Sequence, residues 1–592
     1  MKRVQRHPLI LAYIAALIPA LVMALTQPVW SRVDEAQHAD FIIQLSHGVY
    51  PAADRTVVDP ETLAVMRSTG VFRFADPGSY PAPDLTDIGP PPAGMSARSN
   101  AVWMSRHLWQ LSFESAQTPG YYLLMVPAWW VADRLGGTSA AIYVMRIINA
   151  LLIALLAPMA VVVATRLSPG RAEVAVIAAV FAILLPGLAL NGTRVSNDGL
   201  AAVLGGLAIV VAVGSVGKAW TWRRALLVGL VLGAGLLVKL TLLGLVPAVA
   251  LAMVWPGPGA SPAQRFARTA VMVAVAAACL LLWFLINIHV YGVVVPSART
   301  NRLSEMLPVP FKLPFVGFDI AFFLLSYWSG EPLGALPMAA PFVVLGILIT
   351  LIAVAGLTRL LINRVVPTGP LAVAGAAVCG MASVALLLPA TAGYEFAGPG
   401  RYAYTALPAA AALCGLGVNG AMARTFARRV LSGLYAIAAT GILTAAALSP
   451  QPAPMPGLGM PPSNARLVDA NGRGDQPGLS IAVDRIALDP AHSATWFEVT
   501  ITNSGRGEAE WSATPVASAG GVSVLGDYLR STHMPGDIDA GQTATGWLVV
   551  QIDPSTVHPD GSIFLRFPDV ALDTYAAVED IVVDVRVSSA GV

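Results

Sequence analysis

Residues 8–38 read PLILAYIAALIPALVMALTQPVWSRVDEAQH, an apolar run followed by a cluster of charged side chains. About 20 consecutive apolar residues are enough for a helix to cross a bilayer. Lys2, Arg3 and Arg6 precede the run, and it contains no small-x-small cleavage site. We therefore predict an uncleaved first membrane helix over residues 8–29, with its basic end in the cytoplasm.

The composition of the whole chain agrees with a membrane protein. Of its 592 residues, 56% are hydrophobic and 12% are charged, whereas soluble domains carry about 25% charged residues. A net charge of +2 gives no support for a nucleic-acid partner. Cys279, Cys379 and Cys414 fall inside apolar runs, which is typical of core residues rather than of a disulfide framework or a metal site.

Further apolar runs predict a polytopic α-helical membrane protein with about eleven spans. Basic residues cluster in alternate connections, which favours placing those connections and the N-terminus in the cytoplasm. An even number of crossings must separate the N-terminus from Arg166, and the runs 8–29 and 141–165 already supply two. The shorter run 119–131 is therefore a half-helix in the outer leaflet, and the C-terminus lies outside. The runs lie at 8–29, 141–165, 172–191, 198–214, 222–238, 240–255, 267–289, 338–358, 369–388, 402–421 and 429–448.

The composition divides the chain into a membrane domain (1–449), a Pro-rich linker (450–470) and a C-terminal domain (471–592). Within the first, residues 31–140 form a long outer loop with surface helices, including an amphipathic segment at 34–47. Short alternating strands such as 496–501, 546–552 and 581–587 predict an extracytoplasmic β-sandwich for the last.

Asp34, Glu35 and His38 follow the first span where the chain leaves the bilayer on the outer side. A partly desolvated carboxylate there could act as a general base, but acidic residues also simply favour a helix N-terminus. Glu35 and His38 have i,i+3 spacing and could both contact a divalent metal ion. No further Cys or His nearby completes such a site, so the sequence establishes no cofactor.

Two more charged groups lie in short outer connections. Arg194 and Asp198 flank a tight loop in which Asp198 either caps a helix or faces the same cavity as Asp34. Lys239 interrupts a long apolar run, and Arg401 follows a Gly/Pro-rich turn. Each is either an interfacial cation or a phosphate-binding group.

Acidic and cationic loops on one face suit a donor with a lipid-linked phosphate leaving group: a base for the acceptor and cations for the departing phosphate. The aromatic pairs Tyr121-Tyr122 and Trp129-Trp130 fit an interfacial belt or a wall on which a sugar stacks.

Residues 1–450 resemble the membrane-integral GT-C glycosyltransferases, in particular the lipid-carrier-dependent branch with the aminoarabinose and protein O-mannosyl transferases. The similarity rests on short motifs in a common order. They are Asp34-Glu35 with His38, Pro119-Gly120-Tyr121-Tyr122, Ser196-Asn197-Asp198, Val238-Lys239-Leu240-Thr241 and Gly400-Arg401-Tyr402.

The resemblance implies an inverting transfer of a sugar from a polyprenyl-phosphate donor to a glycan, lipid or protein acceptor at a bacterial plasma membrane. It implies Asp34 or Glu35 as base and Asp198 as a second acid. Lys239, Arg401 and Arg194 would hold the donor phosphate, and His38, Tyr121, Tyr122 and Tyr402 would line the substrate pocket. The Asp-x-Asp motif of metal-dependent oligosaccharyltransferases does not occur in the second outer loop, which leaves metal dependence open.

Two other classes remain as alternatives. A transporter or flippase of lipid-linked saccharides should show related halves and mid-span charges; the sequence shows no evident repeat, and Arg146 is the one charge within a span. A structural scaffold that binds a partner through its β-domain leaves the charged outer loops unexplained.

Overall fold

The computed structural model forms two compact units, which are described separately here. It describes residues 6–69, 110–296, 320, 323–330, 339–392, 400–448 and 460–587, apart from short gaps inside these ranges. The helical unit takes the chain up to Thr69 and from Ser112 to Gln451, and the β unit contains the chain from Pro452 onward. Most of the predicted Pro-rich linker, residues 449–459, and much of the predicted outer loop, residues 70–109, lie outside the described residues.

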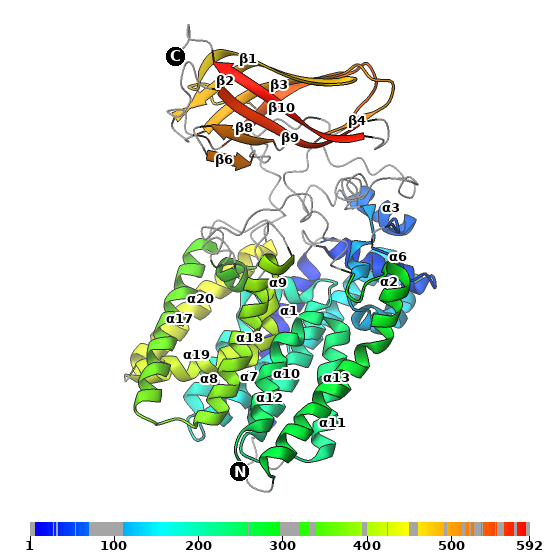
Figure 1. The fold of residues 1–592 in the computed structure, drawn as a ribbon. Coiled ribbons are helices and arrows are strands. Elements are labelled where there is room, and N and C mark those ends of the chain that lie inside the picture. Colours follow the sequence, from blue (N-terminus) through cyan, green and yellow to red (C-terminus); the bar gives the residue numbers. More distant parts are fainter. Residues whose placement is uncertain are drawn as a thin grey trace. The chain divides into compact units, whose positions relative to one another are not determined.

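Seven described stretches of helix are long and apolar enough to cross a membrane. They pack side by side in the helical unit (Figure 1). They are α1 (Arg6–Thr26), α6 (Gly120–Ile153) together with α7 (Leu156–Leu167), α10 (Asp198–Ser215), α13 (Pro262–Tyr291), α17 (Ala339–Ile362), α18 (Thr368–Ala392) and α20 (Thr425–Leu448).

Shorter helices account for the other predicted runs. The pair α8 (Ala172–Ile183) and α9 (Pro186–Thr193) is bent by 49° and would make an eighth span. The remaining three runs form α11 (Trp222–Val238), η3 (Leu240–Leu245) with α12 (Val246–Val254), and η4 (Gly400–Ala406) with α19 (Leu407–Ala421). The chain is thus a polytopic α-helical protein of the predicted class, although α11, α12 and α19 are shorter than a full crossing.

Two breaks in the helices position the polar groups discussed below. In α6, Gly137 adopts a φ of 73°, which glycine reaches without steric cost, so the run 119–131 becomes one arm of a bent helix. Lys239 has extended backbone angles (φ −155°, ψ 120°) between the end of α11 and the start of η3. The apolar run is therefore interrupted at Lys239, as its sequence predicts.

Helix α2 (Glu35–Ser46) differs from the surface helix expected at 34–47. All ten residues from Glu35 to Gln44 are buried, because α2 packs against α6, against α3 (Pro60–Thr69) and against the 3₁₀ turn η2 (Phe113–Ala116). A helix lying on a membrane surface would keep a polar face exposed. The stretch after the first span is instead part of the core of the helical unit.

The β unit is a single antiparallel sheet with strand order β6-β5-β9-β10-β1-β2-β3-β8. β1 pairs with both β2 and β10, and both halves of the sheet contribute side chains to one apolar core. The sheet is therefore a sandwich closed along one edge (Figure 1). Its strands are β1 (Arg466–Gln476), β2 (Leu479–Asp489), β3 (Ala494–Asn503), β4 (Ala509–Glu510), β5 (Val516–Ala519), β6 (Val522–Leu525), β7 (Asp537–Ile538), β8 (Thr543–Val550), β9 (Ser562–Leu572) and β10 (Ala577–Val587).

Alternation along β3 explains the core. Phe497, Val499 and Ile501 point inward and are fully buried, which matches the period of two in this stretch. The first strand begins at Arg466, inside the stretch 450–470 that the sequence assigns to the linker. Polar residues such as Asn471 and Arg473 interrupt the apolar alternation of β1, so the sequence pattern does not predict this strand.

Candidate functional site

The first element of the site is a buried ion pair between Lys239 and Asp198. Lys239 Nζ lies 2.5 Å from Asp198 Oδ1, and both side chains are more than nine-tenths buried. Asp198 is the first residue of α10, where the helix dipole favours a negative charge. Lys239 extends from the break after α11, so the pair joins two separate connections of the helical unit.

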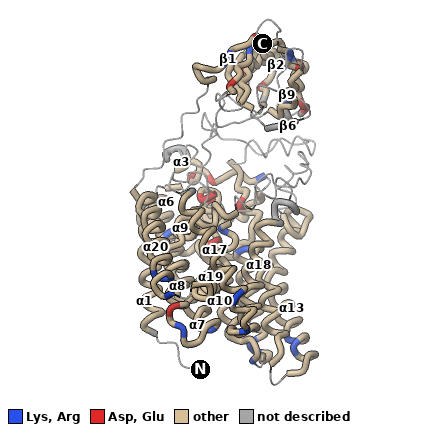
Figure 2. Tube along the Cα trace, turned by 90° about the vertical axis from the view of Figure 1, so that its left-hand side faces the viewer, with Lys and Arg blue, Asp and Glu red and all other residues tan. Residues whose placement is uncertain are grey.

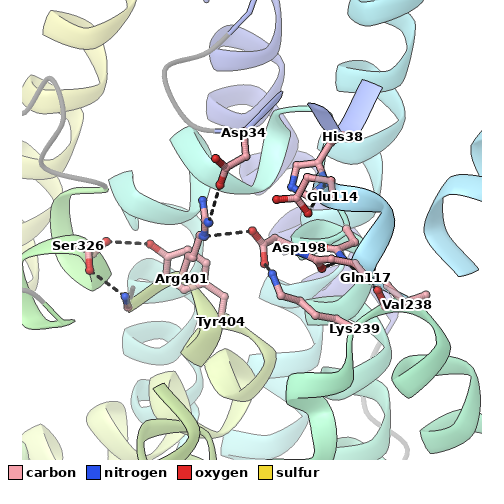
Figure 3. A network of polar contacts seen from close by, with 12 residues as sticks. Asp34, His38, Glu114, Gln117, Asp198, Val238, Lys239, Ser326, Arg401 and Tyr404 are labelled. Carbon is pink, nitrogen blue, oxygen red and sulfur yellow. Dashed lines mark hydrogen bonds and ion pairs between the residues drawn. The ribbon is translucent and has the colours of Figure 1, made fainter. Parts of the chain in front are cut away.

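Arg401 connects this pair to Asp34. Its Nε lies 3.5 Å from Asp198 Oδ2, and its Nη2 lies 3.2 Å from Asp34 Oδ2. Asp34 is the N-cap of α2 with a φ of 55° and makes no capping bond through its side chain. Its carboxylate instead faces Arg401 (Figure 3). The four charged residues therefore converge from the start of α2, the start of α10, the end of α11 and the turn η4.

The residues 323–330 hold η4, and with it Arg401, in place. Ser326 Oγ accepts a 2.8 Å hydrogen bond from the Gly400 amide, and the Tyr404 hydroxyl donates to the carbonyls of Ser326 and Tyr327. A Cβ atom on Gly400 would lie 2.4 Å from the Phe323 carbonyl oxygen. Close backbone packing that only glycine permits thus fixes the turn that carries Arg401.

Glu114 and His38 form a second part of the site, beside Asp34 and Asp198 (Figure 3). His38 Nδ1 lies 2.7 Å from the Tyr122 hydroxyl and 3.5 Å from Glu114 Oε2, and the His38 ring stacks on Tyr122. Glu114 Oε2 is buried and has no hydrogen-bond partner among the described residues. The second part of the site is therefore a buried carboxyl group packed against a histidine that contacts Tyr122.

Burial sets the protonation of this second pair. Desolvation is the main cause that raises the pKa of Glu114 to about 8, and the neighbouring Asp34 carboxylate is the second. Desolvation is also the main cause that holds the pKa of His38 well below its usual value, and the nearby Lys239 ammonium is the second. Both groups are therefore mainly neutral at pH 7, so Glu114 presents a proton rather than a charge.

Glu114 is a site residue that no sequence pattern predicts. It belongs to η2, a single 3₁₀ turn outside every apolar run. One signal could have revealed it: Glu114 is the only acidic residue between Asp87 and Asp133, and it lies five residues before the Pro119-Gly120-Tyr121-Tyr122 motif.

Glu35 has a different environment from its neighbour Asp34. Its two carboxylate oxygens accept hydrogen bonds from Arg146 Nε (2.8 Å) and Nη2 (2.5 Å), and Oε1 also accepts from the Val195 amide. Arg146 Nη1 in turn donates to the Gln27 carbonyl. These contacts tie α2, α6, the end of α1 and the segment before α10 together.

These contacts of the Glu35 carboxylate argue against the two roles that the sequence offers for it, a general base and a metal ligand. An oxygen held by an arginine fork and a backbone amide is a poor base for an incoming hydroxyl. Glu35 and His38 also engage separate partners, and the described residues contain no group of three His, Cys, Asp or Glu side chains that could hold a metal ion. Arg146 is thus the structural partner of Glu35 rather than an isolated mid-span charge.

The remaining predicted site residues lie around this network. The Tyr402 ring makes cation–π contacts with both cations: Lys239 Nζ lies 4.5 Å and Arg401 Cζ 5.8 Å from its ring centre. Tyr121 points to Asn149, whose amide donates to the Tyr121 hydroxyl and to the Arg194 carbonyl. Tyr122 therefore lies on the His38 side of α6 and Tyr121 on the side of the Glu35–Arg146 pair.

Searches with protein-family models and among curated proteins find no match for this chain. Among solved structures, it is similar to the archaeal oligosaccharyltransferase AglB from Archaeoglobus fulgidus in complex with an inhibitory peptide and a dolichol-phosphate. The identity is 12% and the TM-score 0.41, over 75% of this chain and 55% of that one. The apo form of an Archaeoglobus fulgidus oligosaccharyltransferase gives 13% identity and a TM-score of 0.38, over 74% and 55%.

A protein of unknown function from Listeria monocytogenes EGD-e matches 20% of this chain and 83% of its own length, with 13% identity and a TM-score of 0.15. The chain thus spans about half the length of the oligosaccharyltransferases it matches. At these identities and TM-scores the similarities do not assign the chain to a family.

Proposed function

We propose that this protein is a membrane glycosyltransferase that moves a sugar from a polyprenyl-phosphate donor to an acceptor hydroxyl. One observation carries the proposal. Asp34, Asp198, Lys239 and Arg401 come from four separate connections and form one continuous network. Buried charges at membrane depth are costly, so a network of this size indicates a functional site.

The cations suit the leaving group. As the bond between the anomeric carbon and the phosphate oxygen breaks, its electron pair stays on the phosphate. Arg401 and Lys239 would stabilise that negative charge, and Arg401 can present two parallel N–H groups to phosphate oxygens. Arg194, which is buried and close enough to His38 to lower its pKa, is a third cation that we assign to the donor phosphate.

Asp34 suits the acceptor. Its side chain is 24% exposed, against 7% for Asp198, which both cations contact. The acceptor hydroxyl would lose its proton to Asp34 while its oxygen attacks the anomeric carbon from the face opposite the phosphate, which inverts the configuration. A donor phosphate that attracts Arg401 would also weaken the Arg401–Asp34 contact and leave Asp34 free to accept the proton.

Topology supports a location at the outer face of a plasma membrane. Most Lys and Arg of the helical unit lie at the end near the labels α7 and α13, and most Asp and Glu lie at the other end, near α6 and α9 (Figure 2). A basic end favours the cytoplasm, so we place the site, and the β unit that follows α20, outside.

The experiment is a transfer assay with the full chain in nanodiscs and polyprenyl-phosphate sugars as donors. Asp34→Asn should abolish transfer, whereas Asp484→Asn, the same change at an exposed position of β2, should not alter it. Full transfer by the Asp34 variant would remove Asp34 from the mechanism. In proteoliposomes, which separate two compartments, movement of intact donor across the bilayer without transfer would support a transporter instead.

A further inference from the structure

A second polar feature lies at the opposite end of the helical unit. A cavity of about 360 Å³ opens between α10 and α11, and Arg166 from the end of α7 also lines it. Its charged lining residues are Arg166, Lys218 and Arg224, and its apolar lining includes Leu207, Leu227 and Val231.

The length of α10 places this groove relative to the candidate site. α10 runs for 18 residues from Asp198 in the site to Ser215 beside the groove. At about 1.5 Å per residue this is about 27 Å, close to the thickness of the hydrocarbon core of a bilayer. The groove therefore lies at the membrane boundary opposite the site and is separate from it.

Two cations of the groove, Arg166 and Lys218, have little negative charge to balance them. Arg166 donates to the Val210 carbonyl and Lys218 to the Gly214 carbonyl, at the C-terminal end of α10. No carboxylate among the described residues pairs with either side chain. A helix C-terminus supplies only about half a negative charge, which does not balance Arg166 and Lys218.

The surroundings of Lys218 show the same excess. Burial lowers the pKa of Lys218, and the nearby Arg166 and Arg224 lower it further. Elsewhere at this end the protein does use an acidic partner: Arg428 Nη2 lies 2.6 Å from Glu173 Oε2. The groove thus differs from its surroundings by gathering cations from two connections around an open space.

Apolar stripes continue from the cations along both helices. On α11, Arg224, Leu227 and Val231 share one face, because residues three, four and seven apart lie above one another. Leu207 lies on the facing side of α10, and Leu207 and Leu227 are 37% and 61% exposed. A soluble anion would use only the cations, whereas a lipid would also cover these stripes.

We propose that this groove binds an anionic glycerophospholipid from the membrane. Its phosphate would contact Arg166, Lys218 and Arg224, and one acyl chain would lie along Leu207, Leu227 and Val231. Basic pockets between membrane helices suit such headgroups, and the apolar walls select a lipid over a free phosphate.

The test measures thermal unfolding of the purified full chain in detergent while lipid is titrated. Phosphatidylglycerol should raise the Tm with a saturable midpoint, whereas phosphatidylcholine and glycerol 3-phosphate should not. The double variant Lys218→Gln, Arg224→Gln should shift that midpoint roughly 10- to 30-fold upward. Each variant is compared with its own lipid-free Tm, so a change in intrinsic stability does not obscure the result.

Two further variants separate charge from shape. Arg429→Gln removes an exposed cation of α20 outside the groove and should leave the midpoint unchanged. Leu227→Ser keeps every charge and should still weaken the lipid effect. The proposal is overturned if phosphatidylcholine stabilises equally, if glycerol 3-phosphate reproduces the effect, or if Arg429→Gln shifts the midpoint as much as the double variant.

Discussion

Lys239 Nζ lies 2.5 Å from Asp198 Oδ1, although 41 residues separate the two in the chain. Both groups lie at helix ends, Asp198 at the first residue of α10 and Lys239 in the break after α11. Contacts across these two ends allow the helical unit to hold two opposite charges where little water reaches them. The pair therefore affects both the fold and the charge that the site offers a ligand.

Single and double changes at this pair should separate those two contributions. Lys239→Met leaves the buried Asp198 with one cation fewer and should destabilise the protein by about 3 kcal/mol or more. Asp198→Asn combined with Lys239→Met removes both charges and should recover most of that loss. Unfolding in urea measures the stabilities, and equilibrium binding of polyprenyl phosphate measures the site.

Donor binding should not recover in the double variant, because the phosphate has still lost a cation. Restored stability together with restored binding would show that the pair only supports the fold.

Glu114 predicts a particular pH dependence of stability. Its pKa is raised from 4.5 to about 8 in the folded protein, so the folded state holds a proton that the unfolded state has lost. Stability should therefore fall as pH rises from about 4.5 through about 8, by at most about 1.4 kcal/mol per pH unit. The interval from about pH 7 to 8 is the cleanest, because His38, whose folded pKa is lowered, is mainly neutral there in both states.

Glu114→Gln should flatten this slope, since the amide does not titrate. Unfolding free energies of the two proteins between about pH 7 and 8 test this. Parallel slopes would mean that Glu114 is ionised in the folded state.

Asp34 and Glu35 should respond in opposite ways to the same substitution. Asp34 is partly exposed and contacts Arg401 at 3.2 Å, so Asp34→Asn should cost less than about 1 kcal/mol of stability while abolishing transfer. Glu35→Gln disrupts a buried bidentate pair with Arg146 and should cost about 3–5 kcal/mol. Thermal unfolding and the transfer rate per folded molecule distinguish the two, and a reversed pattern would exchange their roles.

These neighbours also show what the sequence can predict. The apolar runs predict the helices, because burial in lipid requires long stretches without charge. The charged breaks at Asp198, Lys239 and Arg401 mark where one helix ends or the next begins. Which of two adjacent carboxylates faces the site depends on the backbone at Asp34, whose φ of 55° no local pattern predicts. On a helix, neighbouring side chains also diverge by about 100°.

Contacts between residues far apart in the chain are equally impossible to predict from local sequence patterns. Glu35 and Arg146 are 111 residues apart, and the sequence offered Arg146 only as a charge inside a span. Glu114 lies in a short 3₁₀ turn with no periodicity to place it. In both cases tertiary packing decides the role of the residue.

The position of Arg401 should depend on the backbone contact beneath it. Gly400→Ala would place a Cβ atom 2.4 Å from both the Phe323 carbonyl oxygen and the Tyr327 amide nitrogen, so η4 must move and carry Arg401 with it. Ser326→Ala adds no atom and removes the hydrogen bonds of Ser326 Oγ to the Gly400 amide and to the Phe323 carbonyl, each worth about 1 kcal/mol. We expect a large loss of donor affinity for the glycine variant and a small one for the serine variant. Gly441→Ala, within α20 and with open space around it, is the matched control and should bind donor normally. Equal donor affinity in all three variants would mean that the site tolerates displacement of η4, and the phosphate would then have to be held by Lys239 without Arg401.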